Sequence, residues 1–299
     1  MTEMNRDDTW VPEVDQRVDA YLGTVVHVVG SRQARPNLPN VGCPFCPGGL
    51  EAPDPYDVRW FSNRWPAMPD DRCEVVLYTP DHNATFWSLG IGGVRKVIDL
   101  WTQRSSELGA RDDVKFVLVF ENRGAEVGAT ISHPHGQIYA YDHVPDRPRR
   151  VFEAGWQPEA EPGDRLVAEA GGWRAYVPAA STYPVAVTLA PLQRVADLTA
   201  LSDEGRTDLA TLLVHVFERL DALYGQPLPY MMWLMQCPTG DGDWADGWFH
   251  IEIVSPWRDA GVPRFIAAAE VACGEYFNPV IPEMLAGRLR DVGQSPSPS

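Results

Sequence analysis

The sequence predicts an α+β fold that consists of two similar halves. Short runs rich in Val, Phe and Trp recur along the chain, as is typical of strands, and two longer segments carry apolar residues at helical spacing. Each half has a strand, a helix, a long strand, a loop and then a strand that carries histidine. This faint repeat predicts halves at residues 1–150 and 151–293, followed by a disordered tail over 294–299.

In the first half, strands are expected where β-branched and aromatic residues cluster between turn residues. They lie at 25–29, 57–62, 73–78, 114–120 and 137–141. A helix is expected over 93–108, because Val94, Val97 and Trp101 recur on one helical face and Gly109 is a natural stop. The run at 114–120 is apolar throughout, which indicates a buried strand.

A shift to Pro, Arg and Glu over 144–163 marks the boundary between the halves. In the second half, Gly171-Gly172 predicts a hairpin between strands at 166–169 and 173–177. Further strands are expected at 185–189, 230–236 and 248–254. The clearest helix covers about 202–224, with Ser202 as its N-cap and Gly225 at its end, and later helices open at Pro263 and run over 282–291.

Composition excludes several classes of function. The 299 residues carry a formal net charge of −16, which argues against binding to nucleic acid or to an anionic membrane. No stretch approaches the roughly 20 apolar residues of a membrane span, and the first residues lack a signal pattern. Five cysteines, an odd number, argue against a disulfide framework. We therefore expect a cytoplasmic protein.

The segment 132–137, Ser-His-Pro-His-Gly-Gln, is the strongest candidate for a functional site. Alternate side chains of an extended segment point to one face, so His133, His135 and Gln137 are expected to project together. Gly136 lacks a Cβ and is expected to let a ligand approach the backbone. A single histidine is more often structural than chemical, so the case for function depends on the neighbouring sequence.

Just upstream are the parts of an anion-binding loop. Two glycines, Gly124 and Gly128, alternate with the polar side chains of Asn122 and Thr130. Glycine-rich backbone with amide and hydroxyl groups commonly binds phosphate. The combination favours a phosphate site next to the histidines.

Four residues could bind a metal ion. Cys43 and Cys46 have the Cys-x-x-Cys spacing of a metal knuckle, although this spacing also occurs in redox pairs or by coincidence. With His82 and His133 they match the two thiolates and two imidazoles of a closed tetrahedral zinc site. The long gaps between the ligands make this spacing only moderately specific.

The run at 121–130 followed by His-Pro-His-Gly-Gln resembles the galactose-1-phosphate uridylyltransferase family, the transferase branch of the histidine-triad superfamily. The resemblance implies a duplicated histidine-triad-like fold, with an antiparallel sheet that forms a half-barrel flanked by helices. It implies that His135 is the nucleophile that attacks the α-phosphorus of UDP-glucose. The uridylyl group would then pass to a hexose 1-phosphate, with galactose 1-phosphate as the expected acceptor, by a ping-pong mechanism.

The residues are consistent with that chemistry. A neutral imidazole is a good nucleophile toward phosphorus, and histidine is largely neutral at pH 7. Gln137 cannot titrate and can only donate a hydrogen bond to a phosphoryl oxygen, which favours transfer between phosphates over hydrolysis. We therefore expect His135 and Gln137 to be the catalytic residues.

The resemblance also implies a set of substrate-binding residues. They are Arg32 and Arg35 for phosphates, Phe45, Phe61, Asn63 and Val75 for uracil and ribose, Asn122, Gly128 and Thr130 for phosphates, and Arg264, Phe265 and Glu270 for the sugar. Arg64 occupies a position that is acidic in some members. A homodimer is expected, because the family places some substrate contacts across a subunit interface.

The same resemblance makes Cys43, Cys46, His82 and His133 the ligands of one structural Zn²⁺ per subunit. Some members bind a second metal, iron, through Glu and three His. Here Glu252 stands in place of the last histidine and arginines lie near the expected Glu. We expect no second metal and a structural pair of His250 with Glu252.

Two alternatives remain open. The chain could be an ADP-sugar or dinucleoside-polyphosphate phosphorylase or adenylyltransferase of the same superfamily. It could also be a catalytically inactive, zinc-stabilised binding module. The expected partners are a nucleotide sugar and a sugar phosphate, with no nucleic acid and no membrane.

Overall fold

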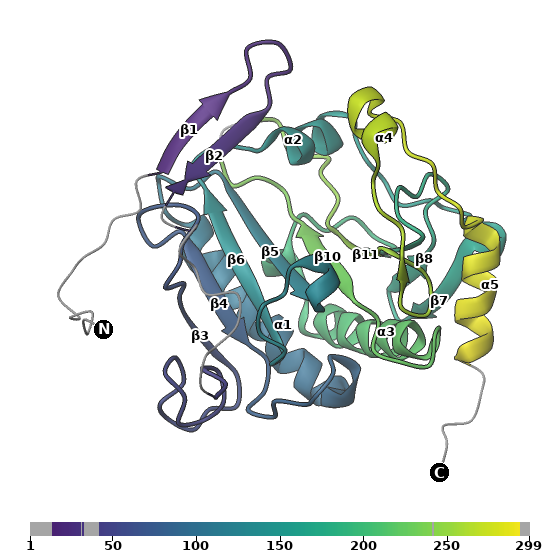
Figure 1. The fold of residues 1–299 in the computed structure, drawn as a ribbon, viewed down its shortest axis with the longest axis horizontal. Coiled ribbons are helices and arrows are strands. Elements are labelled where there is room, and N and C mark those ends of the chain that lie inside the picture. Colours follow the sequence, from purple (N-terminus) through teal and green to yellow (C-terminus); the bar gives the residue numbers. More distant parts are fainter. Residues whose placement is uncertain (1–13, 31, 33–41, 241, 294–299) are drawn as a thin grey trace.

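A computed structural model describes residues 14–30, 32, 42–240 and 242–293. Its centre is an open antiparallel sheet, which confirms the predicted α+β class (Figure 1). Across the sheet the strands are β3 (Arg59–Ser62), β4 (Cys73–Leu77), β6 (His135–Tyr141), β5 (Phe116–Arg123), β10 (Tyr230–Met235), β11 (His250–Ser255), β9 (Val185–Pro191), β8 (Trp173–Tyr176) and β7 (Leu166–Ala170). Most strands expected from the sequence are present within two or three residues of their predicted ends.

The strand order is symmetric about the pair β5–β10. The order β4–β6–β5 on one side is mirrored by β9–β11–β10 on the other. A long helix precedes the central strand of each half in the sequence: α1 (Gly90–Gly109) precedes β5, and α3 (Asp203–Ala222) precedes β10. The internal repeat expected from the sequence is therefore visible in the topology, and strands of both halves form one sheet.

The two long helices pack against each other and against one face of the sheet. Trp101 of α1 and Phe217 of α3 are fully buried there, as their helical spacing predicts. Ser202 accepts a hydrogen bond from the N–H of Gly205 at 3.0 Å, which confirms the predicted N-cap of α3. Gly225 has a φ of 67°, which suits glycine just past a helix end.

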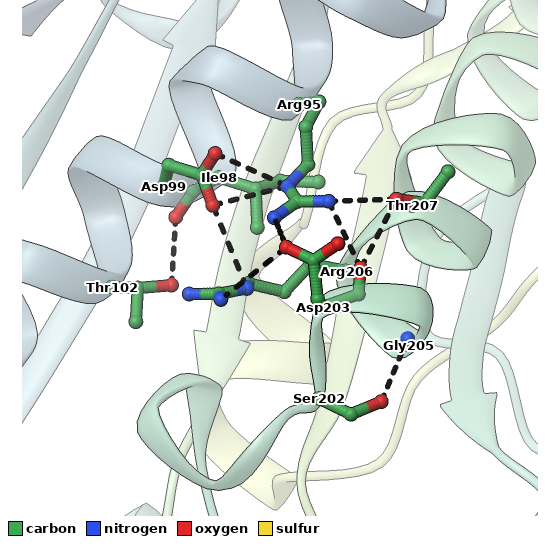
Figure 2. A network of polar contacts seen from close by, with 9 residues as sticks. All are labelled: Arg95, Ile98, Asp99, Thr102, Ser202, Asp203, Gly205, Arg206 and Thr207. Carbon is green, nitrogen blue, oxygen red and sulfur yellow. Dashed lines mark hydrogen bonds and ion pairs between the residues drawn. The ribbon is translucent and has the colours of Figure 1, made fainter.

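A polar network joins the helices near their exposed edge (Figure 2). The guanidinium of Arg95 on α1 binds the carboxylate of Asp99 on its own helix and that of Asp203 at the start of α3. It also donates to the hydroxyl of Thr207, and Arg206 lies 3.5 Å from Asp99. Partly exposed ion pairs add little stability individually, but this network fixes α1 against the first turn of α3.

The remaining elements lie at the periphery. They are the hairpins β1 (Val14–Val18) with β2 (Val25–Val29) and β12 (Trp257–Asp259) with β13 (Val262–Pro263), and the helices α2 (Asp146–Glu153), α4 (Ala268–Cys273) and α5 (Pro282–Val292). Short 3₁₀ turns lie at Trp87–Leu89, Ala125–Val127, Gly163–Arg165 and Leu198–Ala200. Among the described helices, none is long and apolar enough to cross a membrane.

The expectation of a helix that opens at Pro263 is wrong. Pro263 pairs with Trp257 in the β12–β13 hairpin, and the N–H of Arg264 donates to the carbonyl of Pro256. These bonds hold the segment extended, so the helix α4 begins only at Ala268. Residues 294–299, where a disordered tail is expected, lie outside the described part of the chain.

Candidate active site and metal centre

His135 and Gln137 lie on the central strand β6 and share one of its faces. Along β6, Gly136, Ile138 and Ala140 are buried, whereas His135 and Gln137 are half-buried. Ile138 belongs to the core packed against α1, so the two polar side chains face away from that helix. The prediction that these two residues project together is confirmed.

His133 does not share that face, because β6 begins only at His135 and His133 lies in the preceding turn. Its side chain is 1% exposed and lies 3.6 Å from the sulfur of Cys46. The expectation that three side chains project together therefore fails at His133. The turn instead directs the first histidine to the cysteines and the second to the open face.

The imidazole of His135 is held in one tautomer. Its Nδ1 lies 2.7 Å from the carbonyl oxygen of His133. Because a carbonyl only accepts hydrogen bonds, Nδ1 carries the proton and the lone pair is on Nε2. The ring of Phe45 packs edge-on against the imidazole, with centroids 5.0 Å apart. The contact with His133 therefore sets the orientation of the ring, with the lone pair on Nε2.

A cavity of about 670 Å³ opens beside these residues and contains the four positions predicted to bind uracil and ribose. These four residues are Phe45, Phe61, Asn63 and Val75, and they line the cavity together with His135 and Gln137. The Asn63 amide donates to Oε1 of Gln137 at 3.4 Å, so the group that Gln137 can offer a ligand is its own amide N–H. The cavity combines aromatic walls with a few polar groups, as nucleotide sites do.

A larger cavity of about 1110 Å³ lies on the other side of His135, and Asn122 and Thr130 line it. Thr130 and His135 line both cavities, so they stand on the wall between them. Gly128 has a φ of 84° and its N–H bonds to the carbonyl of Ala125. Gly128 therefore shapes the loop, and its predicted contact with phosphate stays a prediction.

Arg32, another predicted phosphate contact, is not among the described residues that line either cavity. Arg32 is half-buried, and its charge opposes the rise that burial causes in the pKa of the Cys73 thiol. Cys73 is at the start of β4 and pairs with Tyr139, whereas Leu77, at the other end of β4, pairs with His135. Because Arg32 acts on Cys73, it lies near the end of β4 that is farther from His135. Arg35 lies outside the described residues.

The predicted sugar-binding residues form a cluster of their own. The buried carboxylate of Glu270 pairs with Arg264 and accepts hydrogen bonds from the N–H groups of Ala267 and Phe277, each at 2.9 Å. The side chain of Phe265 is 78% exposed. None of Arg264, Phe265 and Glu270 is among the residues that line the two cavities beside His135 in the described chain.

The four predicted metal ligands come together. One ligand atom each from Cys43, Cys46, His82 and His133 lies within 4.8 Å of the others. The sulfur of Cys46 lies 3.6 Å from Nδ1 of both His82 and His133. A tetrahedral zinc ion with bonds of about 2.3 Å to sulfur and 2.0–2.1 Å to nitrogen places such atoms about 3.5–3.6 Å apart. The donor set therefore fits a closed metal site.

Outer contacts fix these ligands. Nε2 of His133 lies 2.8 Å from the carbonyl of Thr79, which leaves Nδ1 to face the cysteines. Burial lowers the pKa of His133, which favours the neutral imidazole that binds metals. The Tyr56 hydroxyl lies 2.9 Å from His133 and donates to the carbonyl of Phe45 at 2.6 Å. Tyr56, which the sequence did not suggest, thus ties the cluster to the residue that packs on His135.

In the second half, His250 begins β11 as His135 begins β6. Its Nδ1 lies 3.0 Å from the carbonyl of Trp248, two residues before it, as in the first half. Here, however, Trp156 stacks on the ring at 3.6 Å, and Nε2 lies 3.7 Å from the carboxylate of Glu252. Arg147 binds both oxygens of that carboxylate at 2.9 Å. The predicted pair of His250 with Glu252 is confirmed.

The expectation that Gly136 lets a ligand approach the backbone is wrong. A Cβ at this position would lie 2.1 Å from the hydroxyl oxygen of Tyr78 and 3.1 Å from the carbonyl of Phe120. Tyr78 is buried, and although it lines the larger cavity, Gly136 is not among the described residues that line either cavity beside His135. The sequence could not show this, because the close neighbour is distant in the chain.

We expect Gly136→Ala to destabilise the fold by about 2–3 kcal/mol, because the added methyl group overlaps a fully buried ring. Urea unfolding followed by circular dichroism measures the loss. Tyr78→Phe removes the overlapping oxygen, so the double variant should recover a large part of the stability. A Gly136→Ala variant as stable as the wild type would contradict this account.

Glu121 is a buried carboxyl group for which the sequence suggested no role. It is 4% exposed on β5 and accepts a hydrogen bond from the Tyr230 hydroxyl at 2.6 Å. Burial raises its pKa to about 7. Because the folded state binds this proton more tightly than the unfolded state, its contribution to stability is full in acid and is lost as pH rises through 7.

Between pH 5 and pH 8, Glu121→Gln should therefore lose less stability than the wild type, by up to about 3 kcal/mol. Urea midpoints across this pH range measure the difference. Glu126→Gln removes an exposed carboxylate five residues away and should follow the wild-type curve. Parallel curves for the wild type and Glu121→Gln would show that the buried carboxyl group does not titrate in this range.

Comparisons with known proteins agree with this geometry. The model of the galactose-1-phosphate uridyl transferase N-terminal domain matches residues 62–145, and that of the C-terminal domain matches residues 126–296. A galactose-1-phosphate uridylyltransferase of Thermotoga maritima is 34% identical over 89% of this chain and 94% of its own length. One of Streptomyces lividans is 36% identical over 84% and 78%. A solved uridylyltransferase structure matches with a TM-score of 0.84 at 29% identity, over 93% of this chain and 98% of its own.

Proposed function

The chain belongs to the galactose-1-phosphate uridyl transferase family, and on that basis we propose that it exchanges a uridylyl group between UDP-glucose and galactose 1-phosphate. One observation carries the proposal. His135, with its proton on Nδ1, stands on the wall between an aromatic cavity suited to a nucleoside and a larger cavity lined by Asn122 and Thr130.

In the first step, Nε2 of His135 attacks the α-phosphorus of UDP-glucose. A nitrogen–phosphorus bond forms, the phosphoanhydride bond breaks, and glucose 1-phosphate leaves with the bonding electrons. The carbonyl of His133 keeps its hydrogen bond to Nδ1 and stabilises the positive charge that develops on the ring. The phosphate of galactose 1-phosphate then attacks the uridylyl group and releases His135.

Gln137 supports both steps without exchanging a proton. Its carbonyl oxygen accepts from Asn63, so its amide N–H is directed to a phosphoryl oxygen in the same cavity. Asn122 and Thr130 offer further hydrogen bonds from the adjoining cavity. These fixed donors stabilise charge in the transition state without the proton transfer that attack by water on the phosphorus would require.

Cys43, Cys46, His82 and His133 would hold one zinc ion per subunit. A complete set of four protein ligands has no open position for substrate, so the ion supplies structure rather than chemistry. Its effect on the reaction would come through the chain, because His133 provides the carbonyl that orients His135. No second metal is expected.

We also propose a homodimer. Apolar side chains are exposed along 265–284, where Phe265, Val271 and Phe277 are each at least 67% exposed. A surface of this kind is typical of an interface between subunits. Burial of this segment against a second copy could bring Arg264, Phe265 and Glu270 to the partner's site, which would reconcile their predicted role with their position in the single chain.

The test is incubation of the purified protein with UDP-glucose alone, followed by mass spectrometry of the intact chain. A uridylyl adduct and exchange of labelled glucose 1-phosphate into UDP-glucose support the proposal. A protein that reacts with ADP-glucose instead would be an adenylyl transferase or phosphorylase. Failure to exchange with any nucleotide sugar would favour a binding module. The cytoplasmic location expected from the sequence stays a prediction.

A further inference from the structure

The cavity beside His135 and Gln137 contains one pair of opposite charges. Among its described lining residues, Glu51 and Arg64 are the only ones with fully charged side chains. Nε of Arg64 lies 2.9 Å from Oε1 of Glu51. The Glu51 side chain is 19% exposed and that of Arg64 is 51% exposed, so the carboxylate is the more enclosed partner. An enclosed carboxylate inside a ligand cavity is costly unless it has a partner or a function.

The backbone holds Glu51 firmly in place. Its N–H donates to the carbonyl of Pro44 at 3.0 Å, so the residue is fixed to the Cys-x-x-Cys loop. The close turn depends on Gly49, where a Cβ would lie 2.6 Å from the carbonyl oxygens of Cys43 and Pro44. The main chain of Glu51 therefore has a defined position relative to Phe45 and the metal ligands, and the ion pair with Arg64 restrains its carboxylate.

Arg64 lines the same cavity but belongs to a different segment of the chain. It follows β3 and comes directly after Asn63, whose amide contacts Gln137. The ion pair thus connects the metal-binding loop to the end of β3. A guanidinium can only donate hydrogen bonds, so it orients Glu51 without competing for hydroxyl protons.

The proposed reaction determines what the cavity must contain. With the α-phosphorus at His135, the attached nucleoside extends into the space lined by Phe45 and Phe61. A ribose presents two adjacent hydroxyl groups, and a carboxylate can accept a hydrogen bond from each of them. In the described lining, Glu51 is the only carboxylate available for this purpose.

We propose that Glu51 binds the 2′- and 3′-hydroxyls of the ribose and makes the enzyme selective for ribonucleotide donors, with Arg64 as the residue that positions it. This inference rests on the proposed function, because it requires a nucleoside in this cavity. It assigns donor selectivity to a residue outside the predicted substrate-binding set.

The test is competition between UDP-glucose and 2′-deoxy-UDP-glucose in one reaction. Hydrogen bonds to a charged group correspond to roughly a 10- to 100-fold preference, which we expect for the wild type. In Glu51→Ala the preference should fall to within about threefold, with Glu51→Gln intermediate. Because both donors compete for the same enzyme, the ratio does not depend on the fraction of folded protein.

Asp54→Asn is the matched control. It removes a nearby negative charge that is exposed and does not line the cavity, so it should keep the wild-type ratio. Arg64→Met should lower the ratio in the wild-type background and leave it unchanged in Glu51→Ala. A merely structural role for Arg64 would change both donors equally and leave the ratio as it was.

Three results would overturn the inference. They are equal use of both donors by the wild type, an unchanged ratio in Glu51→Ala, and a higher KM for both donors in Arg64→Met alone, which would place Arg64 on a phosphate instead. Failure of the proposed function is distinct from these, because the wild type would then transfer nothing from UDP-glucose.

Discussion

His135→Ala should lower uridylyl exchange by about four to six orders of magnitude and abolish the adduct that UDP-glucose leaves on the chain. The variant removes the only atom proposed to form a bond to phosphorus, and no neighbouring group on the same face of β6 can replace it, because Gln137 is not nucleophilic. The measurements are the exchange of labelled glucose 1-phosphate and the mass of the intact protein.

The matched control is His250→Ala. His250 begins the equivalent strand and makes the same contact with the carbonyl two residues before it, but it is buried beneath Trp156. Per molecule of folded protein, this variant should form the adduct as the wild type does. An adduct that persists in His135→Ala, or is lost only in His250→Ala, would refute the assignment of the nucleophile.

Cys46→Ala should release the metal ion and lower the free energy of unfolding by several kcal/mol, because structural zinc sites contribute directly to folding. The sulfur of Cys46 lies 3.6 Å from the nitrogens of both histidine ligands, so its loss removes the donor between them. Metal analysis of the purified protein and thermal unfolding with and without a chelator measure the two effects.

Cys273→Ala provides the comparison. Cys273 is an exposed free cysteine outside the cluster, and its removal should alter neither metal content nor the unfolding temperature. A wild-type protein that is isolated without metal and is insensitive to chelators would contradict the proposed role of the four ligands.

Features that depend on local sequence were predicted well. The helix α3 follows from a polar N-cap, an apolar stripe and a terminal glycine, all of which are local signals. The metal ligands were recognised because Cys-x-x-Cys and His-Pro-His are compact, and the resemblance to a family linked them across the chain. The tautomer of His135 was not predictable, because it depends on how the turn directs one carbonyl oxygen.

Features that depend on the fold were missed. Gly136 is required by Tyr78, which lies 58 positions earlier, and no pattern in the sequence connects the two. Glu51 and Arg64 meet only because the metal-binding loop folds back against β3. The helix α2 lies where composition indicates only a boundary between the halves, although Asp146 and Arg150 have the i,i+4 spacing of a helical ion pair.

The symmetric sheet has a consequence for how many nucleotides one polypeptide can carry. The repeat contains two strands that each begin with an imidazole held by the carbonyl two residues before it, and the first of these, His135, lines two cavities. In the second strand, the indole of Trp156 stacks on the ring of His250, and the carboxylate of Glu252, which Arg147 binds, lies beside it. At saturation each chain should therefore carry one covalently bound uridylyl group, with the first half of the fold providing the reactive histidine and the second half providing structural support.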